Sequence, residues 1–182
     1  MSAQSIGGCH LRRELFQPTV EGEARILLLI DAFSSDTRGL EGRTKLAKLD
    51  FFLRYPPFLE RALRIRKPEI KIDVTPTEAN NIENRMVRYR YGPWDPAYFD
   101  LLGRLIGKRL IQVIPASRGL SYKTTDLGRQ LAQKLAKDDS WAEIAQRALL
   151  LKRHLDLKGS NLKDFIYQNF PEVSDATWGD RL

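Results

Sequence analysis

The sequence predicts a mainly α-helical fold that contains one short β-hairpin. Through most of the chain the apolar residues recur three or four positions apart, the spacing of a helix with one buried face. Two short runs, residues 110–114 and 120–124, instead flank a five-residue loop that contains Gly119, and this pattern predicts two paired strands. A length of 182 residues with 42% apolar content suits one domain with a helical extension.

Helices are expected over much of the first half of the chain. Residues 1–22 show no sustained period and are expected to form an N-terminal arm. Apolar residues cover most of a helix surface over residues 23–33, which predicts a buried helix. Thr44 is a suitable N-cap for a helix over residues 44–55, and a third helix is expected over residues 58–66, after two prolines.

The middle of the chain contains both helix and strand signals. Residues 68–76 are expected to form a loop or a short edge strand, and Thr75 is expected to cap a short helix that reaches residue 84. Apolar and basic residues then alternate over residues 86–91, which predicts a third short strand.

A helix over residues 95–108 is expected to precede the hairpin. Asp95 is a suitable N-cap with a proline after it, and Gly107 is a suitable residue to end this helix. After the hairpin, Thr125 is expected to cap another helix, which is followed by helices over residues 141–155 and 161–170.

This order of elements predicts a winged helix-turn-helix with a two-stranded hairpin as its wing and a C-terminal helical extension. In that geometry the helix before the hairpin enters the major groove and the wing tip contacts the DNA backbone, so residues 95–108 become the recognition helix and Arg118 the wing tip. The expected division is an arm over 1–22, a winged-helix domain over 23–137, a helical extension over 138–172 and a frayed tail over 173–182.

The net charge of +7 is concentrated in two blocks of the chain. Residues 41–67 hold eight basic against three acidic residues, and residues 85–130 hold nine against three. Such blocks are typical of a surface that faces a polyanion, although a solvated basic protein explains the charge equally well. The candidate nucleic-acid contacts are Arg43, Lys45, Arg88, Arg90, Arg104, Lys108, Arg109, Arg118 and Lys123.

Sequence-specific DNA recognition is not expected from the helix over residues 95–108. It carries Asp95, Asp100 and two glycines but few of the amide and long polar side chains that recognise base edges. Contact with the DNA backbone and contact with protein alone remain equally good interpretations. A docking or dimer face is predicted on the last helix, where the apolar side consists of Leu162, Phe165, Ile166 and Phe170. The aromatic residues Tyr89, Tyr91, Trp94, Tyr98 and Phe99 are expected to be core rather than base-stacking groups.

The sequence offers no pattern of a catalytic, metal or nucleotide site. Cys9 and His10 are adjacent on the expected arm, and His154 belongs to a helix end, so these residues do not match a zinc-ligand set or an activated nucleophile. Asp50 stands on an apolar helix, where an ion pair with Arg54 four residues later explains it. We therefore expect no enzyme activity, no metal and no cofactor.

The compartment is predicted from cysteine use and hydropathy. The single cysteine cannot form an internal disulfide, which fits a reducing compartment. No apolar run approaches the length that spans a bilayer, and the N-terminus lacks the apolar block of a signal peptide. The chain is expected to be cytoplasmic and without membrane contact.

Several segments together resemble one bacterial family. They are RILLLI at 25–30, GRTKLAKLDF at 42–51, RYRYGPW at 88–94, LIG at 105–107, YKTTDLG at 122–128, LKDFIY at 162–167 and FPE at 170–172. In order and spacing they resemble the winged-helix middle component of ABC three-component systems, the group that includes the small subunit of Lamassu-type anti-phage and anti-plasmid defence.

The resemblance implies a non-catalytic accessory subunit that bridges an SMC- or Rad50-like ATPase and a nuclease or other effector. It supplies no catalytic or binding residues to transfer to this chain. Non-specific contact with the backbone of double-stranded DNA and homodimer formation stay open. The alternative is a free-standing winged-helix transcription regulator, which would form a homodimer on a preferred operator.

Overall fold

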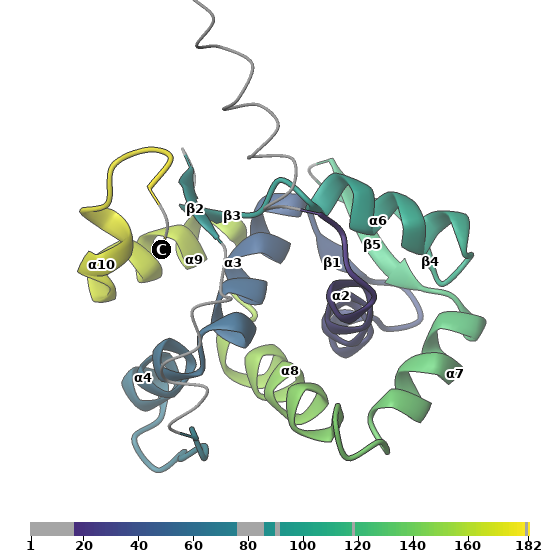
Figure 1. Cartoon of the computed structure of the whole chain (residues 1–182), viewed down its shortest axis with the longest axis horizontal. Coiled ribbons are helices and arrows are strands. Elements are labelled where there is room, and N and C mark those ends of the chain that lie inside the picture. Colours follow the sequence, from purple (N-terminus) through teal and green to yellow (C-terminus); the bar gives the residue numbers. More distant parts are fainter. Residues whose placement is uncertain (1–16, 76–85, 90–91, 118, 181) are drawn as a thin grey trace, which may run out of the picture.

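The computed structural model describes residues 17–75, 86–89, 92–117, 119–180 and 182, and within them the chain is mainly helical (Figure 1). The short helix predicted over residues 76–84 lies outside the described residues. The helices are α2 (Val20–Phe33), α3 (Arg43–Arg54), α4 (Pro56–Arg66), α6 (Tyr98–Gly107), α7 (Asp126–Leu135), α8 (Ala142–Leu155), α9 (Gly159–Asn169) and α10 (Pro171–Ser174). The strands are β1 (Leu40–Glu41), β2 (Val87–Tyr89), β3 (Gly92–Trp94), β4 (Ile111–Pro115) and β5 (Leu120–Thr124).

Helix α2 occupies the centre of the fold. In Figure 1 it lies inside an arc formed by α3, α8, α7 and α6, and it packs against each of these helices and against β5. Its apolar face is buried, as the sequence predicts. The helix begins three residues earlier than predicted, because the Thr19 hydroxyl accepts a hydrogen bond from the Gly22 amide at 3.0 Å and so caps it.

The start of α3 differs from the prediction. Its N-cap is Gly42, and Thr44 lies inside the first turn without a capping role. Gly42 has a φ of 70°, in the left-handed region that glycine tolerates, and this allows the chain to turn directly from β1 into the helix. The predicted break before α4 is confirmed, with Pro56 as its first residue.

The predicted hairpin is confirmed as β4 and β5, which pair in antiparallel register with Val113 opposite Tyr122. The strand predicted over residues 86–91 is present as β2, but the third strand of the hairpin sheet is one that the sequence analysis did not predict. It is β1, which pairs with β5 through Leu40 opposite Tyr122, so the strand order is β1-β5-β4. Strand β2, from the segment predicted as the third strand, pairs with β3 in a separate two-stranded sheet.

The sequence analysis predicted a frayed C-terminal tail, but in the structure the tail is hydrogen-bonded to β2. The Arg88 amide donates to the Asp180 carbonyl at 2.8 Å, and the Gly179 amide donates to the Arg88 carbonyl at 2.8 Å. The Leu182 amide donates to the Met86 carbonyl at 3.0 Å. The tail therefore lies along β2 and supplies hydrogen bonds to strand groups that β3 does not use.

Helix α6 is shorter than predicted at both ends. Asp95 precedes it and accepts a hydrogen bond from the Ala97 amide, and its last residue is Gly107. The residue in the left-handed region after the helix is Arg109, with a φ of 58°, and not a glycine. The Leu110 amide donates to the Leu105 carbonyl at 2.9 Å, which closes the helix end and directs the buried Leu110 into the core.

Helix α7 begins as the sequence predicts. The Thr125 hydroxyl accepts a hydrogen bond from the Gly128 amide at 3.0 Å, so the predicted cap is confirmed. A Cβ atom at position 128 would lie 1.8 Å from the Leu110 carbonyl oxygen, and glycine is therefore required for this close approach. The cap and the glycine together fix the helix against the start of β4.

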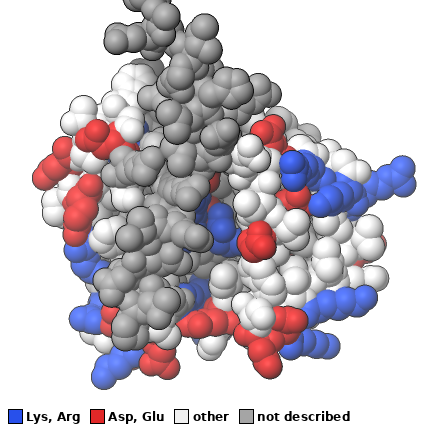
Figure 2. All heavy atoms as spheres, in the orientation of Figure 1, with Lys and Arg blue, Asp and Glu red and all other residues white. Residues whose placement is uncertain are grey.

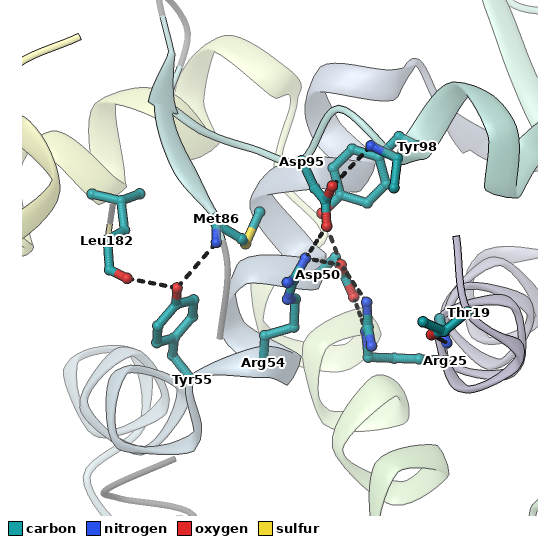
Figure 3. Close-up of polar contacts among 11 residues, drawn as sticks. Thr19, Arg25, Asp50, Arg54, Tyr55, Met86, Asp95, Tyr98 and Leu182 are labelled. Carbon is teal, nitrogen blue, oxygen red and sulfur yellow. Dashed lines mark hydrogen bonds and ion pairs between the residues drawn. The ribbon is translucent and has the colours of Figure 1, made fainter. Parts of the chain in front are cut away.

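A buried ionic network joins α2, α3 and α6 (Figure 3). The Asp50 carboxylate is fully buried and accepts hydrogen bonds from Arg25 Nε at 2.6 Å and from the Tyr98 hydroxyl at 2.7 Å. The predicted ion pair between Asp50 and Arg54 is confirmed at 4.0 Å, but the shorter contact of Arg54 is to Asp95, at 2.5 Å. Asp95, just before α6, thus brings the helix into the same network.

Neighbouring charges and burial have opposite effects on the pKa of Asp50. Burial alone would raise the pKa of this carboxyl, but the Arg25 guanidinium, Arg54 and the Tyr98 hydroxyl hold it below its ordinary value of 3.8. A carboxyl with a depressed pKa contributes stability that is fully present above the unfolded pKa and is lost as the pH falls through the lower folded pKa. Burial, followed by the Asp50 charge, raises the pKa of Tyr98.

Replacement of Asp50 by Asn is expected to lower the free energy of unfolding by about 3–5 kcal/mol, because it leaves Arg25 and Arg54 in the interior without their shared counter-charge. Urea unfolding at pH 7 measures the change. The exposed Asp36→Asn is the control and should change stability by less than about 0.5 kcal/mol. Equal stability of the two variants would show that the network does not hold the helices together.

Candidate interaction surface

The predicted docking face on the last helix is not a surface. Leu162, Ile166 and Phe170 are fully buried, and Phe165 is half-buried. The ring of Phe170 packs between Phe52 and Phe58, with centroid distances of 5.5 and 5.7 Å. The prediction was wrong because the apolar side of α9 is covered by α3 and α10 of the same chain.

Lys45 is likewise not available to nucleic acid. It lies on the buried side of α3, and its ammonium group donates to the Asp156 carboxylate at 2.6 Å. The two residues are 111 positions apart, and together they join α3 to the end of α8. The prediction that Lys45 contacts DNA is therefore wrong, since Lys45 is buried and its ammonium group is held by Asp156, which it shares with Lys152.

Arg88 is also engaged within the fold. It is half-buried on β2, and its guanidinium lies 4.8 Å from the centroid of the Tyr167 ring. It lies in the sheet of β2 and β3, which is separate from the hairpin sheet. Arg90 and Arg118, the other predicted contacts on these strands and at the wing tip, lie outside the described residues.

Two cations of α6 share one buried carboxylate. Glu23, in the first turn of α2, pairs with Arg104 at 3.5 Å and with the Lys108 ammonium group. The Glu23 side chain is buried, whereas both cations are about half exposed. The ion pairs fix the α2 flank of α6 and leave one net positive charge there.

Three predicted contacts carry charge at the surface. Arg43 and Arg109 are exposed, and neither forms an ion pair with another described residue. Lys123 is half-exposed on β5 and donates to the Asp36 carbonyl at 2.5 Å. On the face drawn in Figure 2, Lys and Arg side chains gather at the upper right, in the region where Figure 1 places α6 and β4.

The other flank of α6 is apolar and exposed. Phe99 and Ile106 are seven residues apart, so they lie on the same side of the helix, and their exposed fractions are 56% and 41%. Tyr98, Leu101, Leu102 and Leu105 form the buried side. The same pattern therefore places Phe99 and Ile106 beside the buried stripe, and this was a signal that the sequence analysis did not use.

Glycines form the outermost line of α6. Gly103 and Gly107 are exposed, and a Cβ atom at either position would meet no other atom within 4 Å. The folded chain itself therefore does not require glycine at these positions. A glycine in an exposed helix interior costs about 1 kcal/mol relative to alanine, so Gly103 lowers the stability of the free chain.

The apolar flank continues toward the hairpin. The Arg43 guanidinium lies over the Phe99 ring at 4.4 Å. Burial raises the pKa of the Tyr122 hydroxyl on β5, and the nearby Arg43 charge partly offsets this rise. Val113 of β4 is paired with Tyr122, and Leu120 of β5 lies nearer the hairpin tip. Their exposed fractions are 40% and 55%. The first residue of α3 thus joins α6 to the hairpin.

The predicted aromatic core is confirmed only in part. Tyr98 is fully buried, and Trp94 is half-buried between Tyr89 and Phe99, with centroid distances of 5.8 and 5.9 Å. Phe99 and Tyr89 are exposed, and Trp178 of the tail contacts Tyr89. Tyr91, the remaining residue of the predicted core set, lies outside the described residues.

Lys48 is a buried cation that the sequence analysis missed. Its ammonium group donates to the Thr44 carbonyl at 3.2 Å, and its stem packs against the backbone at Gly92. Burial, with a smaller contribution from the charge of Lys163, lowers its pKa from 10.5 to about 8. The signal in the sequence was its position between Ala47 and Leu49 on the buried face of α3.

Among the described residues, no group of three or more His, Cys, Asp and Glu side chains has a geometry that would hold a metal ion. None of the helices in this part of the chain combines the length and the apolar character needed to cross a membrane. Comparison with known family models, with curated proteins and with solved structures finds no match to this chain.

Replacement of Lys48 by Met is expected to stabilise the chain at pH 7 by up to about 3 kcal/mol, the cost of charging a group whose pKa falls from 10.5 to about 8. Between these pH values the folded chain loses the Lys48 proton while the unfolded chain keeps it, so the stability of the natural chain rises with pH relative to the variant. Urea unfolding at pH 7 and pH 10 measures both effects. A stability difference that does not shrink at pH 10 would contradict the lowered pKa.

Replacement of Gly103 by Ala is expected to raise the free energy of unfolding by about 1 kcal/mol, because alanine favours the helix and the added methyl group meets no atom. Thermal unfolding measures the change. The matched control is Gly128→Ala, which should destabilise the chain because its Cβ would collide with the Leu110 carbonyl. Loss of stability in Gly103→Ala would show a packing role for this glycine.

Proposed function

We propose that the chain is a non-catalytic winged-helix subunit that works by binding other proteins. The order of elements supports this proposal, since helix α2, strand β1, helices α3 and α6 and the hairpin β4–β5 follow one another as in a winged helix. The strand order β1-β5-β4 also agrees with that arrangement. Helix α4 and the sheet of β2 and β3 form an insertion before α6.

The surface of α6 is the observation that carries the proposal. In a winged helix this element reads the major groove through long polar side chains, but here its solvent-facing positions include Phe99, Gly103 and Ile106. Its cations Arg104 and Lys108 are paired with Glu23. Exposed apolar side chains at this position favour a protein partner over DNA.

The partner class comes from the family resemblance of the sequence. We infer an accessory subunit of a cytoplasmic SMC- or Rad50-like ATPase complex in anti-phage or anti-plasmid defence, where the chain bridges the ATPase and an effector. The segments that support this inference include residues 42–51, which form most of α3, and residues 122–128, which join β5 to α7. A bridging subunit needs a surface for each partner and no catalytic centre.

Purification of the tagged chain from its native host tests the proposal. We expect a much larger ATPase to copurify in fixed ratio, both with and without nuclease treatment, as mass spectrometry would show. A chain that purifies alone as a homodimer, or whose partners disappear after nuclease treatment, would contradict the proposal and favour a free-standing DNA-binding regulator.

A second measurement separates protein binding from contact with the DNA backbone. Arg43, Arg109 and Lys123 are the described candidate cations whose charge is least compensated by carboxylates. If they bound phosphates, changing all three to Ala would flatten the slope of log K for DNA against log salt by about one per lost contact. We expect the slope to stay unchanged, and a flatter slope would place these residues in a DNA interface.

A further inference from the structure

We propose that the outer side of α6 binds an amphipathic helix of a partner protein whose apolar stripe is flanked by acidic side chains. This inference rests on the proposed function, since it gives the chemistry of the partner at one of its surfaces. We call this region the α6 surface; it consists of Phe99, Gly103, Ile106 and Gly107, with Arg43 and Arg109 at its edges.

Within the described residues, the apolar part of the α6 surface is only partly covered: Phe99 contacts Trp94 and the Arg43 guanidinium, yet most of its side chain stays exposed. Phe99 and Ile106 are each more than two-fifths exposed, although the buried residues Tyr98, Leu102 and Leu105 alternate with them along the helix. Val113 and Leu120 of the hairpin are also exposed, and the Leu120 carbonyl accepts a hydrogen bond from the Gly42 amide, next to Arg43. Apolar side chains on two neighbouring elements can bind one face of a helix.

The glycines support a helix as the occupant. Gly103 and Gly107 are four residues apart, so they lie one turn apart on the outermost line of α6. No atom of the described residues lies within 4 Å of a Cβ atom placed at either position. Two positions without Cβ atoms in the last turns of α6, after Asp100 on the same line, allow the backbone of a second helix to approach closely beside Ile106.

The charges at the edges support an acidic partner. Within the described residues of this region, Arg43 and Arg109 have no carboxylate partner, and Arg104 and Lys108 share the single Glu23. Asp100 is the one exposed carboxylate on α6. The excess of positive charge around an apolar stripe complements Asp and Glu side chains on either side of a partner's apolar stripe.

Arg109 gives a separate reason to expect this contact. Its φ of 58° belongs to the region where glycine is favoured and where other residues are strained. A glycine there would close the helix end equally well, but it would lack the exposed positive charge of arginine. An arginine at such a position therefore points to a contact made by its side chain.

A second copy of this chain fits the α6 surface less well. In a symmetric dimer, both copies would bring the same excess of positive charge to the contact. Like charges at the edges of an apolar contact oppose association. We therefore assign the surface to a different protein.

Photo-crosslinking in the native host tests the proposal. p-Benzoylphenylalanine replaces Phe99 in the tagged full-length chain, which keeps an aromatic ring at the position, and Leu149 of α8, with an exposed fraction of 60%, is the matched control position. Mass spectrometry then identifies the segment attached to each. We expect a crosslink from position 99, absent from position 149, to a partner segment that has apolar residues at helical spacing and an excess of Asp and Glu.

Three variants test whether the open space at Gly103 and the charge of Arg109 are needed for binding. Gly103→Leu and Arg109→Glu are each expected to reduce the copurified partner by at least about tenfold, whereas Leu149→Glu should leave it unchanged. Thermal unfolding of each variant shows that the chain is folded. A crosslink to DNA, to a second copy or to a basic segment would overturn the proposal, as would equal crosslinking at both positions.

The outcomes also separate this inference from the proposed function. If the ATPase copurifies with the natural chain and equally with Gly103→Leu, the accessory role stands and the assignment of the α6 surface is wrong. If no protein copurifies with the natural chain, the accessory role itself is wrong, and with it the partner proposed for this surface.

Discussion

The buried carboxylate of Asp50 is the interaction on which the arrangement of the central helices depends. It lies where α2, α3 and the start of α6 meet, and it accepts hydrogen bonds from Arg25 of α2 and Tyr98 of α6. A buried charge is costly unless charged and hydrogen-bonding partners surround it, so the three helices must keep a geometry that supplies them. Arg54 adds Asp95 to the same network and thereby fixes the residues that lead into α6.

The position of α6 in turn determines which of its side chains meet solvent. On its buried side, the Tyr98 hydroxyl is hydrogen-bonded to Asp50. At one flank, Arg104 and Lys108 are paired with Glu23 of α2. The opposite flank, with Phe99 and Ile106, therefore faces outward with Arg43 beside it. An ionic network in the interior thus leads to an apolar surface with cationic edges.

The parts of the fold that sequence patterns predicted are those fixed by local contacts. The Thr125 cap and the β4–β5 hairpin depend on residues a few positions apart, and both are confirmed. Strand β1 has two residues, too few to show a period, and its partner β5 lies some eighty positions away. Thr44 had a suitable residue type for an N-cap, but the N-cap of α3 is Gly42; α6 ends at Gly107, yet the left-handed residue that follows it is Arg109 rather than a glycine.

The site depends on distant contacts, which is why it was less predictable. Basic residues were counted equally from the sequence, yet Lys45 is held by Asp156, 111 positions later, while Arg109 stays exposed. The amphipathic pattern of α9 was correct, but a pattern cannot tell whether its apolar side is covered by the same chain, as happens at Leu162 and Ile166. Only the three-dimensional arrangement separates these surfaces.

Hydrogen–deuterium exchange of the chain, alone and in its copurified complex, tests the central claim most directly. Amide protons of residues 98–110 are expected to gain protection in the complex, since a helix bound across α6 would suppress its local opening. The same gain should appear after nuclease treatment. Unchanged exchange over these residues, with protection elsewhere or only in the presence of DNA, would contradict a protein-binding role for α6.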